Sequence, residues 1–321
     1  MAEGYDAKSI KVLEGLEAVR KRPAMYIGST SKTGLHHCVY EVLDNSIDEV
    51  QAGEASFVEV TINKDGSITV NDDGRGIPVE KHESGKSALE VVMTKLHAGG
   101  KFENKAYEIS GGLHGVGVSC VNALSIKLIV EVKRNGKIYM QEYKRGVPKG
   151  AVKVIGKVKD SDTGTKVTFW PDEEIFSTTD FDFTVITTRI RELAFLNPKV
   201  KIIVKDLRKE KEKKEEFHFE GGLKEFVTYI NRTKIAVHKP VYFQKKTDTS
   251  IMEVAIQYVE GYQENIFGFV NTINTVEGGT HISGFKSALT RVVNDYGTKK
   301  NLLKKEKLSG DDVREGLTAI V

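Results

Sequence analysis

The sequence is poor in cysteine, proline and tryptophan, with 2 Cys, 6 Pro and 1 Trp among 321 residues. Its two cysteines, Cys38 and Cys120, stand far apart in apolar surroundings. This excludes a disulfide framework and predicts buried free thiols in a reducing compartment. His36-His37-Cys38 does not indicate zinc, because consecutive helical residues point in different directions and no second cluster completes a site.

Long hydrophobic runs are also lacking: no apolar stretch reaches about 18 residues, and MAEGYDAKSI has no signal-peptide core. We therefore expect a cytoplasmic protein with no membrane partner. The net charge of +3 is small for 321 residues, which gives no indication of an extended DNA-binding tail. The length predicts about two domains.

The stretch 36–50 (HHCVYEVLDNSIDEV) has apolar residues at helical spacing and an acidic opposite face. Such a face is typical of a solvated surface helix. A second interpretation is a catalytic site, because Glu41 and Asn45 lie one turn apart and therefore side by side. A carboxylate beside a carboxamide can hold a water and a hard metal ion together. His37, one turn before Glu41, can orient that carboxylate through a hydrogen bond.

A glycine segment, Gly112-Leu-His-Gly115-Val-Gly117, precedes a short helix predicted at 118–124. It matches neither the dinucleotide loop nor the P-loop. Its glycines still let backbone N–H groups approach an anion, just before a helix begins. Phosphate binding and a plain flexible loop are both open at this point.

A carboxylate, Asp72, ends a predicted strand and is followed by two nearby glycines in Asp72-Asp-Gly-Arg-Gly. A buried Asp at this place can accept a hydrogen bond from an exocyclic amine. Thr165, in GTKVTF, can supply a hydroxyl to the same pocket. An ordinary turn is the alternative.

The remaining pattern predicts a sheet followed by a second unit that begins near Glu220. Lys205–Glu216 is charged at every position except Leu207, and its alternating signs favour a solvated hairpin tip over a nucleic-acid patch. The lysine-rich stretch 299–307 favours a surface loop. Strands are predicted at 57–63, 67–71, 126–146, 151–158 and 165–171, and helices at 10–22, 87–96, 184–196, 223–231 and 280–296.

These motifs, in this order, resemble the ATP-binding fold shared by gyrase, the ninety-kilodalton heat-shock chaperones, sensor histidine kinases and MutL proteins. Further stretches resemble the B subunits of the bacterial type II topoisomerases, gyrase and topoisomerase IV, along the whole chain. Ile282 favours the gyrase branch, because topoisomerase IV often has an acidic residue after Gly-Gly-Thr-His. The stretches are RKRPAMYIG, YEVLDNSIDE, NDDGRGIPV, LHAGGKF, SGGLHGVGVSCVNAL and EGGTHISGF.

The resemblance implies a role for each matching residue. Glu41 matches the general base, His37 the residue that aligns it and Asn45 the Mg²⁺ ligand. Arg75, Pro78 and Arg134 match the rim where aminocoumarins bind. The implied ATP-binding residues are Tyr5, from a partner-reaching arm, with Asn45, Asp72, Arg75, Gly76, Ile77, Pro78, Lys101, Tyr107, Leu113, His114, Gly115, Val116, Gly117, Val118 and Thr165.

The resemblance also implies an α+β fold in two domains. Residues 1–219 are expected to form an ATP-binding sandwich, a mixed sheet with helices on one face, with a dimerisation arm at about 1–15. Residues 220–321 are expected to form a βαβ-type transducer domain. Relatives continue beyond the last strand to a Gln-Thr-Lys loop, so we expect a C-terminally truncated transducer.

The implied function is Mg-ATP hydrolysis that drives dimer closure for DNA strand passage and negative supercoiling. The implied partners are a second copy, DNA and the gyrase A subunit in an A2B2 heterotetramer. A nucleotide-gated clamp with little turnover, and a kinase or chaperone using the same pocket, are alternatives.

Overall fold

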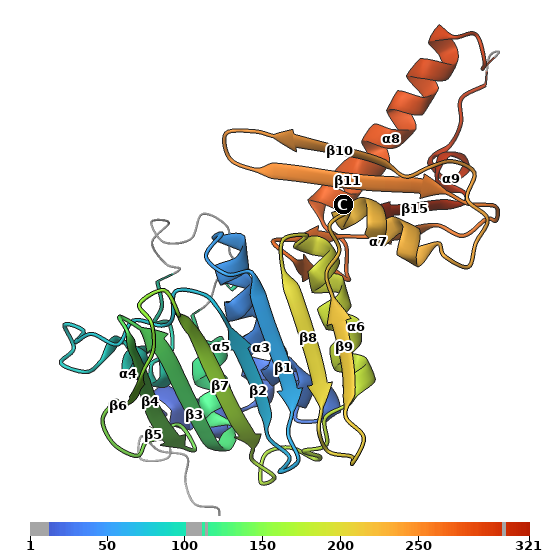
Figure 1. Ribbon diagram of the computed structural model, residues 1–321. Helices are drawn as coiled ribbons and strands as arrows, with labels where there is room; N and C mark the ends of the chain where they lie inside the picture. Colours follow the sequence, from blue (N-terminus) through green and yellow to red (C-terminus); the bar gives the residue numbers. More distant parts are fainter. Residues whose placement is uncertain (1–12, 101–110, 113–114, 304–305) are drawn as a thin grey trace, which may run out of the picture. The chain divides into compact units, whose positions relative to one another are not determined.

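A mixed β-sheet and the helices on one of its faces form the first part of the molecule (Figure 1). The computed structural model describes residues 13–100, 111–112, 115–303 and 306–321. Within them, contacts divide the chain into two units. Unit 1 comprises residues up to Arg191 together with Val200–Phe217, and unit 2 comprises Glu192–Lys199 together with His218–Val321.

The sheet of unit 1 has nine strands in the order β5-β4-β3-β7-β2-β1-β8-β9, with β6 also paired to β4. β1 and β8 are parallel, and the other pairs are antiparallel. The strands are β1 Phe57–Ile62, β2 Ile68–Asp72, β3 Ser125–Arg134, β4 Lys137–Lys144, β5 Val147–Pro148, β6 Lys153–Lys157, β7 Gly164–Pro171, β8 Lys201–Asp206 and β9 Lys213–Phe217.

One face of this sheet is covered by helices, as the alternation along β3 shows. Leu128, Val130 and Val132 are fully buried, whereas Ile129 and Glu131 between them are partly exposed. Figure 1 shows the longer helices on the same side of the sheet. The helices are α1 Gly15–Lys21, α2 Ala24–Ile27, α3 Lys32–Gln51, α4 Ala88–Thr94, α5 Gly117–Ala123 and α6 Phe183–Leu196.

The central helix α3 begins four residues earlier than the apolar spacing predicts. Ser31 adopts an extended conformation as N-cap, and its hydroxyl accepts a hydrogen bond from the Thr33 N–H. The predicted stretch 36–50 therefore lacks the first turn of α3, which contains polar residues and the fully buried Leu35.

The first predicted helix, 10–22, is also shorter in the described residues. α1 covers Gly15–Lys21, and Pro23 then starts the separate turn α2. Residues 1–12, which include Tyr5 and most of the predicted arm, lie outside the described residues.

Unit 2 contains a sheet in the order β10-β11-β15-β12 and the helices α7, α8 and α9. β12 and β15 are parallel and α8 lies between them in sequence, so this part has the expected βαβ connection. The bounds are α7 Gly222–Ile230, β10 Val241–Lys246, β11 Ile251–Tyr258, β12 Asn265–Phe267, β13 Phe269–Val270, β14 Ile273–Asn274, α8 Thr280–Lys299, α9 Gly310–Arg314 and β15 Leu317–Ile320.

Aromatic rings organise the core of unit 2. Phe195 stacks on Phe219 and Phe226, with ring centroids 3.7 and 4.7 Å apart. Val227 and Ile320 complete this core from α7 and β15. Glu192–Lys199 is thus grouped with unit 2, a division inside α6 that the hydrophobic pattern does not indicate. The boundary at 219/220 stays a prediction.

Candidate nucleotide site

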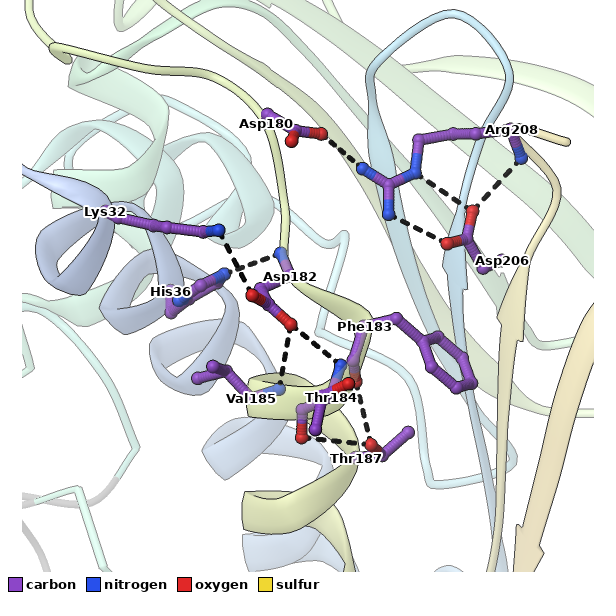
Figure 2. A network of polar contacts seen from close by, with 10 residues as sticks. All are labelled: Lys32, His36, Asp180, Asp182, Phe183, Thr184, Val185, Thr187, Asp206 and Arg208. Carbon is purple, nitrogen blue, oxygen red and sulfur yellow. Dashed lines mark hydrogen bonds and ion pairs between the residues drawn. The ribbon is translucent and has the colours of Figure 1, made fainter.

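Helix α3 carries the central side chains of the candidate site, and polar contacts fix its N-terminal half (Figure 2). Lys32 Nζ lies 3.1 Å from Asp182 Oδ2, and the buried His36 accepts a hydrogen bond at Nε2 from the Asp182 N–H, at 2.9 Å. Asp182 also caps the first turn of α6. These contacts hold α3 against the segment that leads into α6.

His37 and Glu41 lie one turn apart on α3 and form the predicted hydrogen bond. Nε2 of His37 is 3.0 Å from Oε1 of Glu41, and both side chains are partly exposed. The hydrogen bond to Glu41 raises the pKa of His37 above its ordinary value. The ring therefore holds one carboxylate oxygen and leaves Oε2 directed elsewhere.

The other oxygen, Oε2, lies against Gly117 at the start of α5. A β-carbon placed on Gly117 would stand 1.9 Å from Oε2. Only a glycine therefore leaves room for the Glu41 carboxylate where the glycine segment enters a helix. The structure thus brings together the carboxylate and the end of the segment predicted to bind phosphate.

Asn45 lies one turn after Glu41 and directs its amide nitrogen to the helix itself. Nδ2 donates to the Glu41 carbonyl oxygen at 3.0 Å. Its side-chain oxygen is therefore the atom suited to a cation. The described residues contain no group of three or more His, Cys, Asp or Glu side chains that would hold a metal. Mg²⁺ does not need one, because it keeps waters and substrate phosphates as most of its ligands.

Asp72, at the end of β2, is the most buried carboxylate of the site after Asp48, with 8% exposure. The Ser46 hydroxyl donates to Oδ2 at 2.8 Å, and the N–H groups of Gly74 and Thr165 donate to Oδ1 at 3.0 and 3.1 Å. Burial raises the pKa of Asp72 to about 6. The predicted neighbour Thr165 is present, and its hydroxyl accepts from the Ile77 N–H at 3.2 Å.

The second aspartate of this motif, Asp73, has a different role. Its carboxylate accepts hydrogen bonds from Ser56 and Phe57 and closes the approach to β1. Gly164 lets β7 come close to Asp72, because φ is +144° and a β-carbon would stand 2.1 Å from the Asp72 carbonyl oxygen. In this motif Asp72 is therefore the candidate ligand-binding residue, whereas Asp73 stabilises the local backbone.

Arg75 is tied to α3 by Glu49, a residue that the sequence motifs did not indicate. Its Nη2 and Nε lie 2.7 and 3.0 Å from the two carboxylate oxygens of Glu49. Arg134 Nη1 donates to the carbonyl oxygens of Arg75 and Gly76 at 3.1 and 3.0 Å. Two predicted rim residues, Arg75 and Arg134, are therefore in contact, and Pro78 is exposed nearby in sequence.

Asp48 is a further candidate residue, which helical spacing placed only on the acidic face of α3. It is 1% exposed, and its Oδ1 accepts from the Gly111 N–H at 2.9 Å. The acidic face is therefore not simply solvated. Helical spacing places Ser46, Asp48 and Glu49 near the other candidates, but it does not give their partners on β2 and the glycine segment.

The glycine segment is described only in part. The Gly115 carbonyl accepts from the Ala98 N–H at 3.3 Å, and Val116 caps α5, with Val118 in its first turn. The predicted ligands Tyr5, Lys101, Tyr107, Leu113 and His114 lie outside the described residues. Both cysteines are free and buried, as predicted, and burial raises the pKa of Cys120 to about 12.

Comparison with known families covers most of the chain. Residues 30–175 match the family of histidine kinase-, DNA gyrase B- and HSP90-like ATPases. Residues 222–321 match the DNA gyrase B family. None of the helices in the described ranges combines the length and hydropathy of a bilayer-spanning segment.

Individual relatives agree with these matches. The DNA gyrase B protein of Halalkalibacterium halodurans is 55% identical over 99% of this chain and 50% of its own length. That of Thermotoga maritima is 56% identical over 99% and 51%. The chain spans about half the length of these curated relatives. A crystal structure of the 43K ATPase domain of Thermus thermophilus gyrase B with an aminocoumarin is 40% identical, covers 95% of this chain and 80% of that one, and superposes with a TM-score of 0.82.

Proposed function

The chain belongs to the DNA gyrase B family and carries its ATPase region, and from this premise we propose which residues bind and hydrolyse Mg-ATP. The observation that carries the proposal is the position of the Glu41 carboxylate. His37 holds one oxygen, and the other lies at Gly117, where the glycine segment enters α5. This position supports Glu41 as the base that acts at a terminal phosphate.

In this proposal Glu41 accepts a proton from a water molecule. The water oxygen bonds to the γ-phosphorus as the bond to the bridging oxygen breaks, and ADP and inorganic phosphate are released. His37 positions Glu41. Asn45 Oδ1 would hold Mg²⁺, and the bound ion would neutralise charge on the phosphate oxygens.

Asp72 is proposed to read adenine. A buried carboxylate among Ser46, Gly74 and Thr165 can accept a hydrogen bond from the exocyclic amine, and guanine presents a carbonyl at that position. The backbone from Gly115 to Val118, with Gly76 and Ile77, is proposed to line the nucleotide. The same role is proposed for Tyr5, Lys101, Tyr107, Leu113 and His114.

The whole protein's activity is a further proposal, since the chain spans half of its curated relatives. We propose ATP-gated dimerisation, partnership with DNA and a gyrase A subunit in an A2B2 assembly, DNA strand passage and negative supercoiling. The solved relative binds an aminocoumarin. We propose that Arg75, Pro78 and Arg134 form the rim for such an inhibitor here.

The test separates binding from turnover. Calorimetry with ATP and Mg²⁺ measures affinity, and release of inorganic phosphate measures hydrolysis. ATP binding with phosphate released to water is expected. Phosphate retained on a histidine would indicate a kinase, and binding with no release under any condition would indicate a nucleotide-gated clamp. No measurable ATP binding would contradict the proposed site itself.

A further inference from the structure

A depression of about 310 Å³ lies in unit 1 away from the candidate nucleotide site. Trp170 lies five residues beyond Thr165 on β7, or roughly 16 Å along the strand. Trp170 also alternates with the buried Phe169, so it lies on the sheet face opposite the helices. The depression is lined by Ile126, Lys127, Lys144, Lys149 and Trp170. An inference about it does not rest on the proposed ATPase function.

Trp170 forms a fixed wall of the depression. Its Nε1–H donates to Asp65 Oδ2 at 3.1 Å, and Asp65 is itself held by the backbone and hydroxyl of Ser67. Lys127, its direct partner across β3 and β7, has Nζ 4.9 Å from the ring centroid. Ile126 is 39% exposed beside them. A planar apolar surface thus lies next to a cation.

Two lysines of the depression come from neighbouring strands. Leu128 and Tyr143 are the last pair of β3 with β4, and Lys127 and Lys144 are the residues next to that pair. Over the described ranges, neither ammonium group has a carboxylate partner, whereas Lys149 lies 3.1 Å from Glu142. Two ammonium groups that line one depression repel each other. An anion between them would relieve that repulsion.

Other lysines on the same sheet face are already neutralised. Lys166 lies 2.7 Å from Glu131, and Lys205 lies 2.8 Å from Glu59. The positive charge at Lys127 and Lys144 is therefore local and does not extend as a track along the sheet. A local site suits one small anion better than a nucleic-acid backbone, which needs several cations in a row.

We propose that this depression binds a small aromatic anion. The ring of the ligand packs against Trp170 and Ile126, and its phosphate or carboxylate group lies between Lys127 and Lys144. The volume is at the lower end of the range of about 300–1,000 Å³ for small-molecule sites, which fits a single ring with one anionic group.

Trp170 is the only tryptophan of the chain, so its fluorescence reports on this depression without a label. Phenyl phosphate is the probe, with inorganic phosphate and phenol as its anionic and aromatic halves. The expected result is a saturable change in Trp170 emission with phenyl phosphate, and a weaker response to either half. Equal responses to phenol and phenyl phosphate, or no saturable response, would overturn the proposal.

Variants test the lysines. Lys127→Gln combined with Lys144→Gln should weaken phenyl phosphate binding about tenfold, since both cations that would pair with the phosphate group are lost and solvent-exposed ion pairs are weak. The control Lys166→Gln on the same face should leave binding unchanged. The double variant removes both the repulsion and the contact of Lys127 with Trp170, so its thermal midpoint should change little. Unchanged affinity in the double variant would contradict the site. A stronger, lysine-dependent response to duplex DNA than to phenyl phosphate would replace the small anion with nucleic acid.

Discussion

The Glu41 carboxylate occupies the space where Gly117 would otherwise carry a side chain. A β-carbon on Gly117 would stand 1.9 Å from Oε2, far inside van der Waals contact, while His37 holds Oε1 at 3.0 Å. The position of the proposed base therefore depends on a glycine in another element, α5. Catalysis should be sensitive to this glycine even though it carries no chemical group.

Gly117→Ala should lower phosphate release roughly 10²-fold, because the methyl group displaces the carboxylate and misplacement by about 1 Å has effects of that size. The displaced atom ends a flexible side chain, so the thermal midpoint should change little. Steady-state phosphate release and thermal unfolding measure the two effects. Gly284→Ala is the matched control, because a β-carbon there meets nothing within 4 Å. Full activity in Gly117→Ala would show that Glu41 is not the base or does not act from this position.

Glu41→Gln should bind ATP as well as the parent but lose ~10²–10⁴-fold in hydrolysis, which is the typical effect of removing a general base. The amide keeps the shape of the carboxylate and cannot accept the proton. Calorimetry and phosphate release are measured on the same preparation. Glu83→Gln, at an exposed position, is the control. Similar phosphate release by parent and Glu41→Gln would refute the assignment.

Asp72→Asn should weaken ATP binding roughly 10–150-fold, since one charge-assisted hydrogen bond contributes ~1.5–3 kcal/mol. The replacement is isosteric, and the amide oxygen still accepts from Gly74 and Thr165. The unsubstituted protein should bind GTP poorly, because guanine presents a carbonyl oxygen where adenine presents the amine that donates to Asp72. Calorimetric titration with both nucleotides checks this, and unchanged ATP affinity in the variant would remove Asp72 as the adenine reader.

Because of His36, the free energy of unfolding should decrease as the pH falls. Burial lowers the pKa of His36, and its Nε2 accepts the Asp182 N–H, so the folded state keeps the ring neutral. Asp182, Asp180 and Lys32 are the charged groups around it. Because the unfolded state takes up a proton below about pH 6.5, this contribution is present above that pH and is lost as pH falls toward the folded pKa.

The measurement is urea unfolding of the parent and of His36→Gln at pH 7.5 and 5.5. The parent should lose up to ~1.4 kcal/mol more than the variant over this interval, because one extra proton is bound on unfolding. Asp72 has a raised pKa and acts in the opposite direction, but it is present in both proteins. Equal losses in the two proteins would show that His36 does not titrate on unfolding.

Most elements could be predicted from the sequence because their hydrophobic periods are clear. Strand β1 was expected at 57–63 and is found at Phe57–Ile62, and α6 was expected at 184–196 and is found at Phe183–Leu196. The start of α3 was missed because Ser31, a capping residue, begins it before any apolar repeat. A local hydrogen bond at the N-cap sets this boundary, and the spacing of apolar residues gives no information about such a bond.

For the candidate site, prediction worked along one helix and failed between elements. The His37–Glu41 hydrogen bond followed from helical spacing alone. The pairs Ser46–Asp72 and Glu49–Arg75 join α3 to the end of β2 and the turn after it, and they depend on how the sheet packs against that helix. Residue type and spacing within one element carry no information about such packing.

The parallel pairing of β1 with β8 has a consequence for synthesis on the ribosome. Phe57 pairs with Lys201 and Ile62 with Asp206, while β2, the other neighbour of β1, follows it directly in sequence. A nascent chain can therefore form the β1–β2 hairpin early but must leave the other edge of β1 open until β8 has emerged. That open edge exposes backbone groups next to Val58, Val60 and Ile62, which are fully buried in the finished sheet. At ~5–20 residues per second this interval lasts roughly 7–30 seconds, during which the open edge of β1 can pair with a strand of another chain.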